Sequence, residues 1–428
     1  MRQKPLFNDH QSHIHQMIQS AVAAVDPCKC TQDSLRFDGT QLETVGKKFN
    51  LEKGRLFLVA IGKAAVPMAN GVIGSLGKLI EAGVAVTKKG QSEIIKHPKV
   101  QTLFAAHPVP DDSSIRAADA IFELLEQTAE NDFVLFLISG GASALCTRPL
   151  LDMITWQTLS QDLLASGCTI QEFNTVRKQL DRVKGGGLAQ AAFPAEIATL
   201  VLSDVIGNPI DMIGSGPTTP NPQTPSDALG ILKKFNIKNE AAVEQLVFLE
   251  KGQILADFES PYEIVADLRI ATVAAKEQAL TFGYATKIVS TTLSGEAREV
   301  GQRAAAIGRE LQPGTCAIFG GETTVTLTGN GVGGRNQELA LAAAIALDGV
   351  EDVVIATYAT DGDDGPTIAA GAIVTRQTVA LGRKLGLNAE AYLANHDSYT
   401  YFDQLDGHLI ITGQTGTNVN DLLFVIRY

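Results

Sequence analysis

Apolar residues along the chain form short continuous runs that alternate with segments of helical periodicity. Two runs, Leu56–Ile61 and Phe133–Ile138, contain no polar position, which is typical of strands buried on both faces of a parallel sheet. Further strands are predicted at 83–87, 100–105, 197–203, 262–266, 286–291, 318–319, 323–328, 353–358, 409–412 and 422–427, with Gly320 and Gly321 as a turn. Spacings of three and four predict helices at 14–25, 64–76, 115–127, 154–165, 171–180, 226–235, 241–248, 268–280, 296–311 and 337–347. This alternation predicts an α/β fold.

A polar stretch at 250–261 interrupts the pattern and is the best candidate for a domain boundary. We place the domains at 1–255 and 256–428, because 428 residues suit two globular domains. Each part reads as an α/β unit of its own.

Two predicted strands end directly in residues that suit catalysis. Lys63 follows the strand Leu56–Ile61 and precedes a helix, and Asp204 follows the strand predicted at 197–203. In open α/β sheets ligands bind at the carboxyl ends of the strands. An aspartate there can bind Mg²⁺ or accept a proton, although it can equally be a turn or cap residue.

Two glycine-rich loops of the first part suggest phosphate binding. Ser139-Gly140-Gly141-Ala142-Ser143 follows a buried strand and offers backbone N–H and hydroxyl donors. Lys184-Gly185-Gly186-Gly187 interrupts a helical pattern within a basic cluster, at a cost in helix stability that suggests a functional site. His107, in the stiff turn HPVPD, could be catalytic, but no partner is evident in the sequence, so we expect a loop histidine with a satisfied hydrogen bond.

The stretch at 318–338, IFGGETTVTLTGNGVGGRNQE, predicts two strands, a glycine loop and the start of a helix. A helix N-terminus offers free N–H groups, so this start, with Arg335, predicts an anion seat. Asp361, in the turn TDGDDGPT, is a candidate metal ligand, but the turn lacks the distal glutamate of an EF-hand.

Composition narrows the class of partner. The net charge of −12 and a pI near 5.1 argue against nucleic acid and anionic membranes. Five sparse cysteines indicate a reducing compartment, so we expect a cytoplasmic protein. Cys28 and Cys30 have no second pair to complete a zinc site. The oligomeric state stays open, with a homodimer as one assembly.

Three functions compete for these loops. A kinase would use several donor-rich loops, cations and Mg²⁺, because phosphoryl transfer depends on positioning and charge neutralisation. A dehydrogenase would use Gly329, Gly331 and Gly334 as a G-x-G-x-x-G fingerprint, with Asp361 on the ribose. A non-enzymatic carboxylate-binding protein would explain the loops but not Lys63 together with Asp204. The number of loops favours the kinase.

A set of motifs in one order resembles the class II glycerate kinases (glycerate 2-kinases), whose C-terminal half is called the MOFRL domain. The motifs span nearly the whole chain and read IGKAA, HPVPD, SGGASAL, NTVRKQLDRVKGGGLA, LVLSDVIGN, SGPTTP, LSGEARE, GGETTVTLTGNGVGGRNQELALA, ATDGDDGPTIAAGA and TGTNVNDL. Each is weak alone, but their number and order make the resemblance strong.

The resemblance implies a Rossmann-like α/β/α N-terminal domain, a smaller mixed α/β C-terminal domain, and an active site in the cleft between them. It implies phosphorylation of D-glycerate at the 2-hydroxyl by ATP with Mg²⁺. Some bacterial relatives carry the label hydroxypyruvate reductase, which matches the dehydrogenase alternative. The chain departs from the family at Asn208, where an acid is common, which puts a metal role for that position in doubt.

The resulting hypothesis gives each candidate residue a role. Lys63, Asp204 and Arg335 are the catalytic candidates, with Lys63 neutralising the transferring phosphoryl group and Arg335 binding the glycerate carboxylate. Asp204 orients or deprotonates the hydroxyl or holds Mg²⁺, and Asp361 is the second metal candidate. The candidates for nucleotide contact are Ser139, Gly140, Gly141, Ser143, Lys184, Gly185, Gly186, Gly187 and Glu322.

Overall fold

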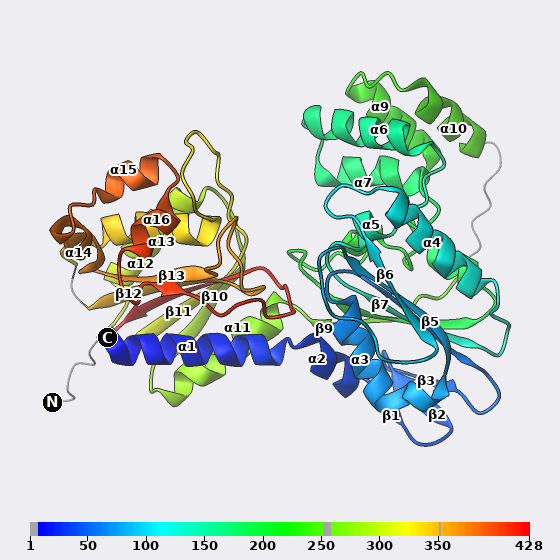
Figure 1. The fold of residues 1–428 in the computed structure, drawn as a ribbon, viewed down its shortest axis with the longest axis horizontal. Coiled ribbons are helices and arrows are strands. Elements are labelled where there is room, and N and C mark those ends of the chain that lie inside the picture. The colour runs from blue at the N-terminus through cyan, green and yellow to red at the C-terminus, as the bar shows by residue number, and fades with distance from the viewer. Residues whose placement is uncertain (1–6, 251–257, 351) are drawn as a thin grey trace. The chain divides into compact units, whose positions relative to one another are not determined.

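The computed structural model describes residues 7–250, 258–350 and 352–428 and divides the chain into two compact units (Figure 1). Residues Pro27–Val265 form the first, which we call the central unit. Residues Met1–Asp26 and Ala266–Tyr428 together form the second, the terminal unit. The boundary expected at 255/256 lies outside the described residues. The two units instead divide between Val265 and Ala266, and the first 26 residues belong with the C-terminal part of the chain.

The central unit is built on a six-stranded sheet of order β6-β5-β4-β7-β8-β9. The strands are β4 (Leu56–Ile61), β5 (Ile80–Lys88), β6 (Val100–Ala105), β7 (Phe133–Ile138), β8 (Glu196–Leu202) and β9 (Tyr262–Ala266). The first five along the chain pair in parallel. Strand β9, expected in the second domain, instead forms an edge of this sheet beside β8.

Helices and a small hairpin sheet complete the central unit. The helices are α2 (Pro27–Asp33), α3 (Ala65–Leu76), α4 (Asp112–Leu125), α5 (Ala142–Leu145), α6 (Met153–Ala165), α7 (Ile170–Gln179), α8 (Gly187–Ala192), α9 (Pro225–Lys234) and α10 (Glu240–Glu250). Short strands β1 (Arg36–Phe37), β2 (Gln41–Thr44) and β3 (Lys47–Asn50) form an antiparallel sheet that the hydrophobic pattern did not predict.

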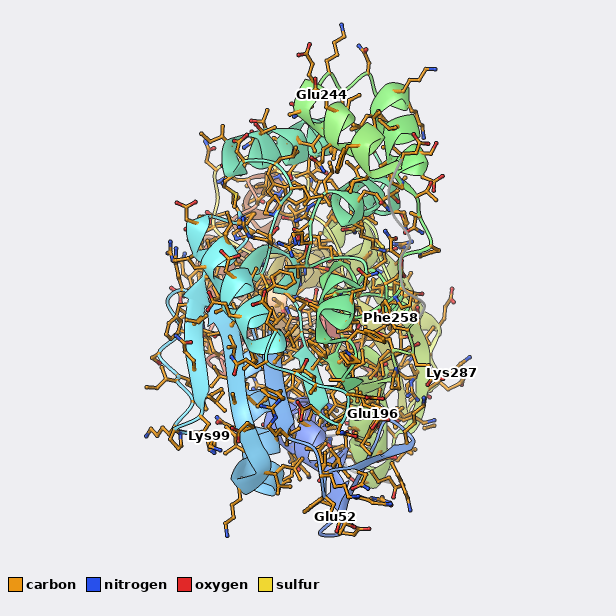
Figure 2. The ribbon with its side chains drawn as sticks, turned by 90° about the vertical axis from the view of Figure 1, so that its right-hand side faces the viewer. Glu52, Lys99, Glu196, Glu244, Phe258 and Lys287 are labelled. Carbon is orange, nitrogen blue, oxygen red and sulfur yellow. The ribbon has the colours of Figure 1, made fainter. Side chains whose placement is uncertain are left out.

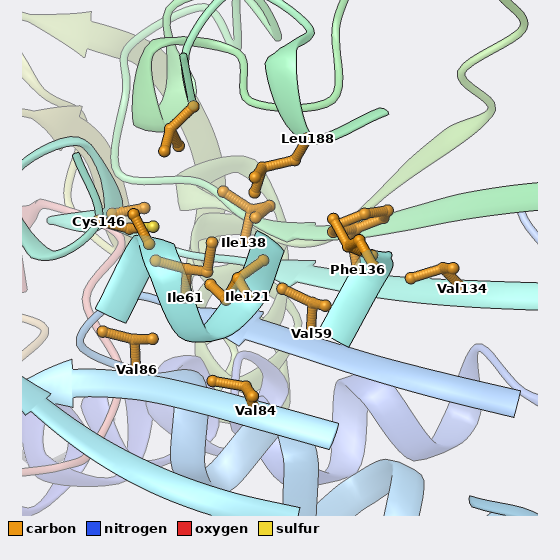
Figure 3. Packing of buried hydrophobic residues seen from close by; sticks show 14 of the residues in the cluster. Val59, Ile61, Val84, Val86, Ile121, Val134, Phe136, Ile138, Cys146 and Leu188 are labelled. Carbon is orange, nitrogen blue, oxygen red and sulfur yellow. The ribbon is translucent and has the colours of Figure 1, made fainter. Parts of the chain in front are cut away.

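The core of the central unit lies against the parallel sheet (Figure 3). Strands β4 and β7 have every residue buried, as their continuous apolar runs predict. Val59 and Phe136 from these strands pack with Ile121 of α4 and Leu188 of α8 in one cluster. Helices α6, α7, α9 and α10 bury a second cluster around Trp156.

The terminal unit contains a mixed sheet of order β10-β11-β15-β12-β13-β14. Its strands are β10 (Ala285–Leu293), β11 (Thr315–Gly321), β12 (Val353–Ala359), β13 (Gly371–Thr375), β14 (Leu409–Ile410) and β15 (Asp421–Arg427). Strands β10 and β11 are parallel, and the other neighbours pair antiparallel. The helices are α1 (Phe7–Ala24), α11 (Leu268–Thr281), α12 (Ala297–Glu310), α13 (Arg335–Ala346), α14 (Thr378–Lys384), α15 (Ala389–Ala394) and α16 (Ser398–Asp403).

The first helix belongs to the terminal unit, although the sequence pattern placed it in the N-terminal domain. Helix α1 packs against α11, with Ile14 and Met17 fully buried. His13 accepts or donates a hydrogen bond at Tyr284 Oη, at 2.9 Å, and stacks on Phe282 at 4.0 Å between ring centroids. These contacts join the start of the chain to residues more than 260 positions away.

One predicted strand is wrong. Residues 323–328 form no strand and make only an isolated bridge between Thr324 and Glu296. Their threonines are used as loop residues instead, since Thr326 donates through its backbone N–H to the Glu296 carboxylate. β-Branched residues favour strands only where a neighbouring strand is available to pair with them.

Charged side chains such as Glu52, Lys99 and Glu244 point outward from the fold (Figure 2). Within the described ranges, no helix has the length and apolar character needed to cross a membrane.

Candidate functional site

The central sheet has a topological switch point between β4 and β7. From β4 the chain adds β5 and β6 on one side and then crosses to add β7 and β8 on the other. Loops diverge at such a point and leave a crevice at the carboxyl ends of the strands. Lys63 follows β4 and the Ser139–Ser143 loop follows β7, so both lie at this point.

Two glycines of that loop bring the candidate side chains together. A Cβ atom on Gly140 would lie 2.0 Å from Asp204 Oδ2, so the carboxylate rests directly on the glycine. A Cβ atom on Gly141 would lie 3.4 Å from Lys63 Cγ and 3.1 Å from His107 Cδ2. Larger residues would displace these side chains. The structure therefore gathers Lys63, Asp204 and His107 around two adjacent glycines.

Some polar groups of this loop form hydrogen bonds within the described part of the protein, and two of its backbone N–H groups do not. Ser139 Oγ accepts a hydrogen bond from Ala64 N at 3.1 Å, and Gly140 O accepts one from Lys63 N at 2.9 Å. These two bonds hold the loop against the residues that follow β4. The N–H groups of Gly140 and Gly141 have no acceptor among the described residues. These two donors can bind an anion at the crevice.

The ring of His107, which the sequence favoured as that of a loop histidine, lies beside Gly141 of the candidate loop. Burial, together with the positive charges of Lys63 and Lys88, lowers the pKa of its imidazole to about 4. The ring is therefore neutral at physiological pH. The signal in the sequence was the stiff turn HPVPD directly after a strand, but which loop it reaches depends on the fold.

Lys184 has a structural role that the sequence did not indicate. Its side chain and that of Asp181 are fully buried, with Nζ 3.0 Å from Asp181 Oδ2. Nζ also donates to Ser143 O at 2.8 Å. Asp181 accepts further hydrogen bonds from Thr147 Oγ1 and from Arg148 N. A buried lysine with these partners cannot reach a nucleotide, so we no longer expect Lys184 to contact ATP.

The three glycines after Lys184 are also committed within the chain. Gly185 N donates to Ser215 O at 3.0 Å, Gly186 N to Gly216 O at 2.8 Å, and Gly187 N to Lys184 O at 3.2 Å. Donors already used in this way are not available to a phosphate. The hydroxyl of Ser143 is likewise bonded to that of Ser215, at 2.8 Å.

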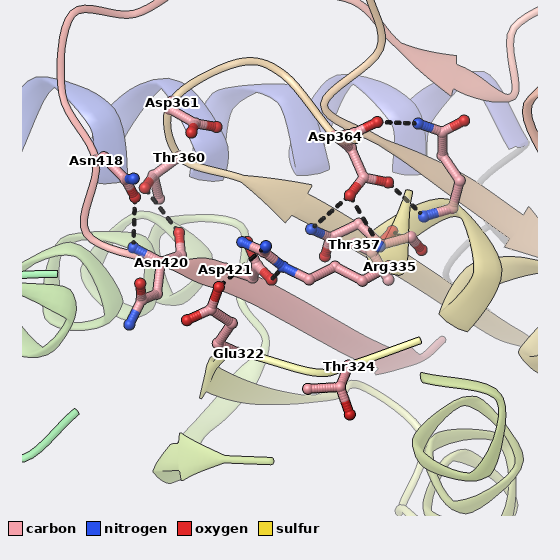
Figure 4. Close-up of polar contacts among 12 residues, drawn as sticks. Glu322, Thr324, Arg335, Thr357, Thr360, Asp361, Asp364, Asn418, Asn420 and Asp421 are labelled. Carbon is pink, nitrogen blue, oxygen red and sulfur yellow. Dashed lines mark hydrogen bonds and ion pairs between the residues drawn. The ribbon is translucent and has the colours of Figure 1, made fainter. Parts of the chain in front are cut away.

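Arg335 lies in the terminal unit at the start of α13 and is held by two carboxylates (Figure 4). Asp421 accepts from Nε at 2.6 Å and from Nη2 at 3.0 Å. Glu322 pairs with Nη1 at 3.0 Å. Burial disfavours the charge, but Asp421 outweighs it and raises the pKa of Arg335 above its usual value. Two of the five guanidinium N–H donors are hydrogen-bonded to Asp421, while Glu322 makes an ion pair at Nη1.

The anion seat predicted at the start of α13 is filled by the chain itself. The carboxylate of Asp364 accepts from Asn336 N at 3.1 Å and from Gln337 N at 2.8 Å (Figure 4). Burial raises the pKa of Asp364 to about 7, against the stabilising backbone hydrogen bonds. A ligand phosphate cannot use these N–H groups while Asp364 occupies them.

This arrangement removes the structural basis for the dinucleotide fingerprint. A Cβ atom on Gly329 would lie 2.6 Å from Asn395 O, and one on Gly331 would lie 2.4 Å from Asp397 Cβ. One on Gly334 would lie 2.2 Å from Asp364 Cγ. The glycines thus allow close packing against other parts of the chain, and not against a pyrophosphate.

Asp361 has local partners in the turn after β12. Its carboxylate accepts from Asp363 N at 3.3 Å, and its carbonyl oxygen accepts from Thr415 N at 3.1 Å. In the part of the chain that the structure describes, no three His, Cys, Asp or Glu side chains form a group that could hold a metal ion. Asp204 belongs to the central unit and Asp361 to the terminal unit.

Comparison with known proteins places this arrangement in a family. A model described as a domain of unknown function (DUF4147) matches residues 13–248, and the MOFRL family model matches residues 315–421. The D-glycerate 2-kinase of Thermotoga maritima is 42% identical, over 95% of this chain and 96% of the relative. The chain belongs to the glycerate 2-kinase family with a C-terminal MOFRL domain.

Other members of the glycerate 2-kinase family carry two different names. The glycerate 2-kinase of Pyrococcus horikoshii is 37% identical, over 96% of each chain. A putative hydroxypyruvate reductase of Agrobacterium vitis is 36% identical, over 96% of this chain and 93% of its own. The crystal structure of a glycerate kinase from Thermotoga maritima superimposes with a TM-score of 0.89 at 40% identity, covering 98% of this chain and all of the other. The α/β fold with a separate mixed C-terminal sheet is therefore confirmed as that of the family.

Proposed function

We propose that this protein is an ATP-dependent glycerate 2-kinase that converts D-glycerate to 2-phosphoglycerate. The observation that carries the proposal is 42% identity to a D-glycerate 2-kinase along nearly the full length of both chains. The site in the central unit supports it, because a lysine, a carboxylate and two free N–H groups gather at the switch point of the sheet. Phosphoryl transfer needs such positioned positive charge and donors.

In the central unit, different residues bind the phosphates of the nucleotide and neutralise their charge. The N–H groups of Gly140 and Gly141 bind phosphate oxygens of the nucleotide. The Lys63 ammonium lies beside Gly141, has no ion-pair partner within the described residues, and neutralises charge that develops on the transferring group. These interactions strengthen as charge moves in the transition state, so they act on kcat more than on substrate affinity.

Asp204 is the residue of the central unit that would hold Mg²⁺. Magnesium in kinases is bound by one or two carboxylates together with the phosphates of the substrate, so a single carboxylate fits this requirement. When bound, Mg²⁺ neutralises charge on the β- and γ-phosphates. Asp361 is the second candidate, but its turn contacts give it a structural role as well.

Arg335 is the candidate for binding an anionic group of the substrate, and Glu322 is its exposed partner. The side chain of Glu322 is 46% exposed, whereas that of Asp421 is 9% exposed. An incoming carboxylate can replace Glu322 at Nη1, while Asp421 keeps the guanidinium oriented. Glu322 therefore contributes to this site by competing for Arg335, and its earlier assignment to the nucleotide has no support from these contacts.

A coupled assay tests the proposal. Purified protein is given D-glycerate, ATP and Mg²⁺, with enolase and without phosphoglycerate mutase. Phosphoenolpyruvate formation would show that 2-phosphoglycerate is made. Formation only after mutase is added would mean that the 3-hydroxyl is used.

The name hydroxypyruvate reductase is tested in parallel. NADH and NADPH oxidation is measured with hydroxypyruvate in the absence of ATP. Oxidation of NADH or NADPH, together with no ADP formed in the kinase assay, would overturn the proposed function.

A further inference from the structure

The imidazole of His107 reaches from the edge of the central sheet into the site at its switch point. His107 follows β6, yet its ring lies against Gly141 in the loop after β7. A Cβ atom on Gly141 would be 3.2 Å from Nε2 of the ring and 3.4 Å from Cγ of Lys63. The ring of His107 and the side chain of Lys63 therefore both lie beside Gly141. The preceding residue, Gly140, lies against the carboxylate of Asp204.

The turn that carries His107 is fixed by the acid at its other end. Asp111 caps α4, accepting through Oδ1 from Ser113 N at 2.8 Å, and Ser114 Oγ completes the capping box. Lys89 Nζ pairs with Asp111 Oδ2 at 2.6 Å. Despite the cost of partial burial, these contacts hold the pKa of Asp111 at about 2, so it stays charged. These contacts fix the end of the turn that follows His107 at the start of α4.

The ring nitrogens of His107 are available for hydrogen bonding. His107 is half-buried, but neither nitrogen has a hydrogen-bond partner among the described residues. Other histidines use their rings in the structure: His97 Nε2 bonds to Gly77 O at 3.1 Å, and His396 Nδ1 bonds to Glu338 at 2.8 Å. A half-buried imidazole that lies beside the same glycine as a lysine, with its ring nitrogens unused by the described residues, suits contact with a ligand atom.

We propose that His107 is the general base of the transfer, accepting the proton of the hydroxyl that attacks the γ-phosphorus. This inference rests on the proposed kinase function. The hydroxyl O–H bond breaks as its oxygen bonds to phosphorus, the bond from phosphorus to the leaving ADP oxygen breaks, and the proton moves to a ring nitrogen of His107. The imidazolium then releases the proton to solvent. In this scheme the carboxylate of Asp204 serves as the metal ligand and not as the base.

The environment of the ring suits this role. Its neutral form, present at physiological pH because of burial and Lys63, carries the lone pair that a base needs. Phosphates beside Lys63 would offset the positive charge that now disfavours imidazolium. The basicity of His107 therefore rises when the nucleotide is in place.

Two variants and one spectroscopic measurement test the inference. His107→Gln keeps a polar side chain of similar size that cannot accept a proton at neutral pH. We expect its kcat to fall by about 10²- to 10⁴-fold, with little change in the KM for ATP and partial rescue by added imidazole. His97→Gln, in the same unit but bonded to Gly77, is the matched control and should keep the wild-type kcat.

Histidine labelled at Cε1 provides a readout independent of turnover. The chain has seven histidines, so the His107 signal can be assigned by its loss in His107→Gln. D-Glycerate with a non-hydrolysable ATP analogue should shift the His107 signal and leave that of His97 in place.

The outcomes separate the two proposals. If wild-type protein makes 2-phosphoglycerate and His107→Gln is equally active, or the His107 signal does not move, His107 is not the base and the kinase function stands. If His107→Gln is inactive but imidazole gives no rescue and the signal is unmoved, the residue is structural and the inference also fails. Wild-type protein that makes no phosphoglycerate would overturn the kinase function and the role of His107 with it.

Discussion

The guanidinium of Arg335 donates two hydrogen bonds to the single carboxylate of Asp421, from Nε at 2.6 Å and from Nη2 at 3.0 Å. Asp421 begins β15 and Arg335 begins α13, so the pair joins the sheet of the terminal unit to helix α13. Two parallel N–H···O bonds fix both the position and the plane of an arginine. The direction in which Arg335 presents its remaining donors is therefore set by Asp421.

Replacing Arg335 with lysine should lower both substrate affinity and stability. A lysine cannot make the two-pronged bond, so buried Asp421 would be left with a poorer partner. We expect a loss of about 1–3 kcal/mol in the free energy of unfolding and a clear rise in the KM for glycerate. Arg383→Lys, whose partner Asp348 is near the surface, is the control. A glycerate KM equal to that of wild type would refute substrate binding by Arg335.

Removing the Lys63 ammonium should slow turnover and leave substrate binding largely intact. Lys63→Ala is expected to reduce kcat by about 10²- to 10³-fold, because the charge it neutralises develops mainly in the transition state. Lys99→Ala, at an exposed pair with Glu81, should behave as wild type. Steady-state kinetics of the two variants measure this, and an unchanged kcat for Lys63→Ala would show that the lysine has another role.

A single methyl group on Gly140 should disturb the site through Asp204. Gly140→Ala would place its Cβ within 2.0 Å of the Asp204 carboxylate, which must then move. A displacement of this kind can reduce kcat by about 10²-fold. Gly230→Ala, with no atom near its Cβ in α9, is the control and should be slightly stabilising. Full activity in Gly140→Ala would mean that the position of Asp204 is unimportant for the reaction.

Lys184 should prove necessary for folding. Lys184→Met leaves Asp181 as a buried carboxylate without its cation, which costs about 3–5 kcal/mol. The exposed pair of Lys234 and Glu172 provides the comparison, and Lys234→Met should change stability little. Urea denaturation of both variants gives the difference. A stable Lys184→Met protein with a raised KM for ATP would restore the nucleotide role first assigned to this lysine.

His107 should make the protein less stable in acid. Its pKa is about 4 in the folded state against an ordinary value of 6.5, so between these values the unfolded chain binds more protons. The contribution of the neutral ring to stability is complete above pH 6.5 and is lost as the pH falls toward 4. The midpoint of urea unfolding, measured from pH 4 to 7, should fall less steeply on acidification in His107→Gln than in wild type. Parallel curves for the two proteins would contradict the assigned environment.

The hydrophobic pattern predicted the strands that position the site, because a run of apolar residues can be recognised without knowing what it packs against. Leu56–Ile61 and Phe133–Ile138 are buried on both faces and have the bounds that the apolar runs indicated. The residues that follow them, Lys63 and Gly140, could therefore be placed at strand ends without any tertiary information. Strand β13, Gly371–Thr375, was missed because it follows directly on a glycine-rich turn and is short.

The partners of the charged residues could not be predicted in the same way. Asp421 lies 86 positions from Arg335, and Asp364 lies 28 positions from the helix start that it caps. Glycine and arginine near a helix start are compatible with an external anion and with an internal carboxylate, and only the fold decides between them. Lys184 was misread for the same reason, since burial of a lysine depends on the acid beside it.

The pairing of helix α1 with helix α11 constrains how the protein is made. Synthesis proceeds from the N-terminus, so the central unit, Pro27–Val265, emerges complete while most of the terminal unit is still absent. Helix α1 then carries Ile14, Met17, Ile18 and Ala21, all buried in the finished protein, without the helix α11 that covers them. The nascent chain must keep this apolar face from aggregating until α11, Leu268–Thr281, has been made, which gives chaperones a defined segment to shield.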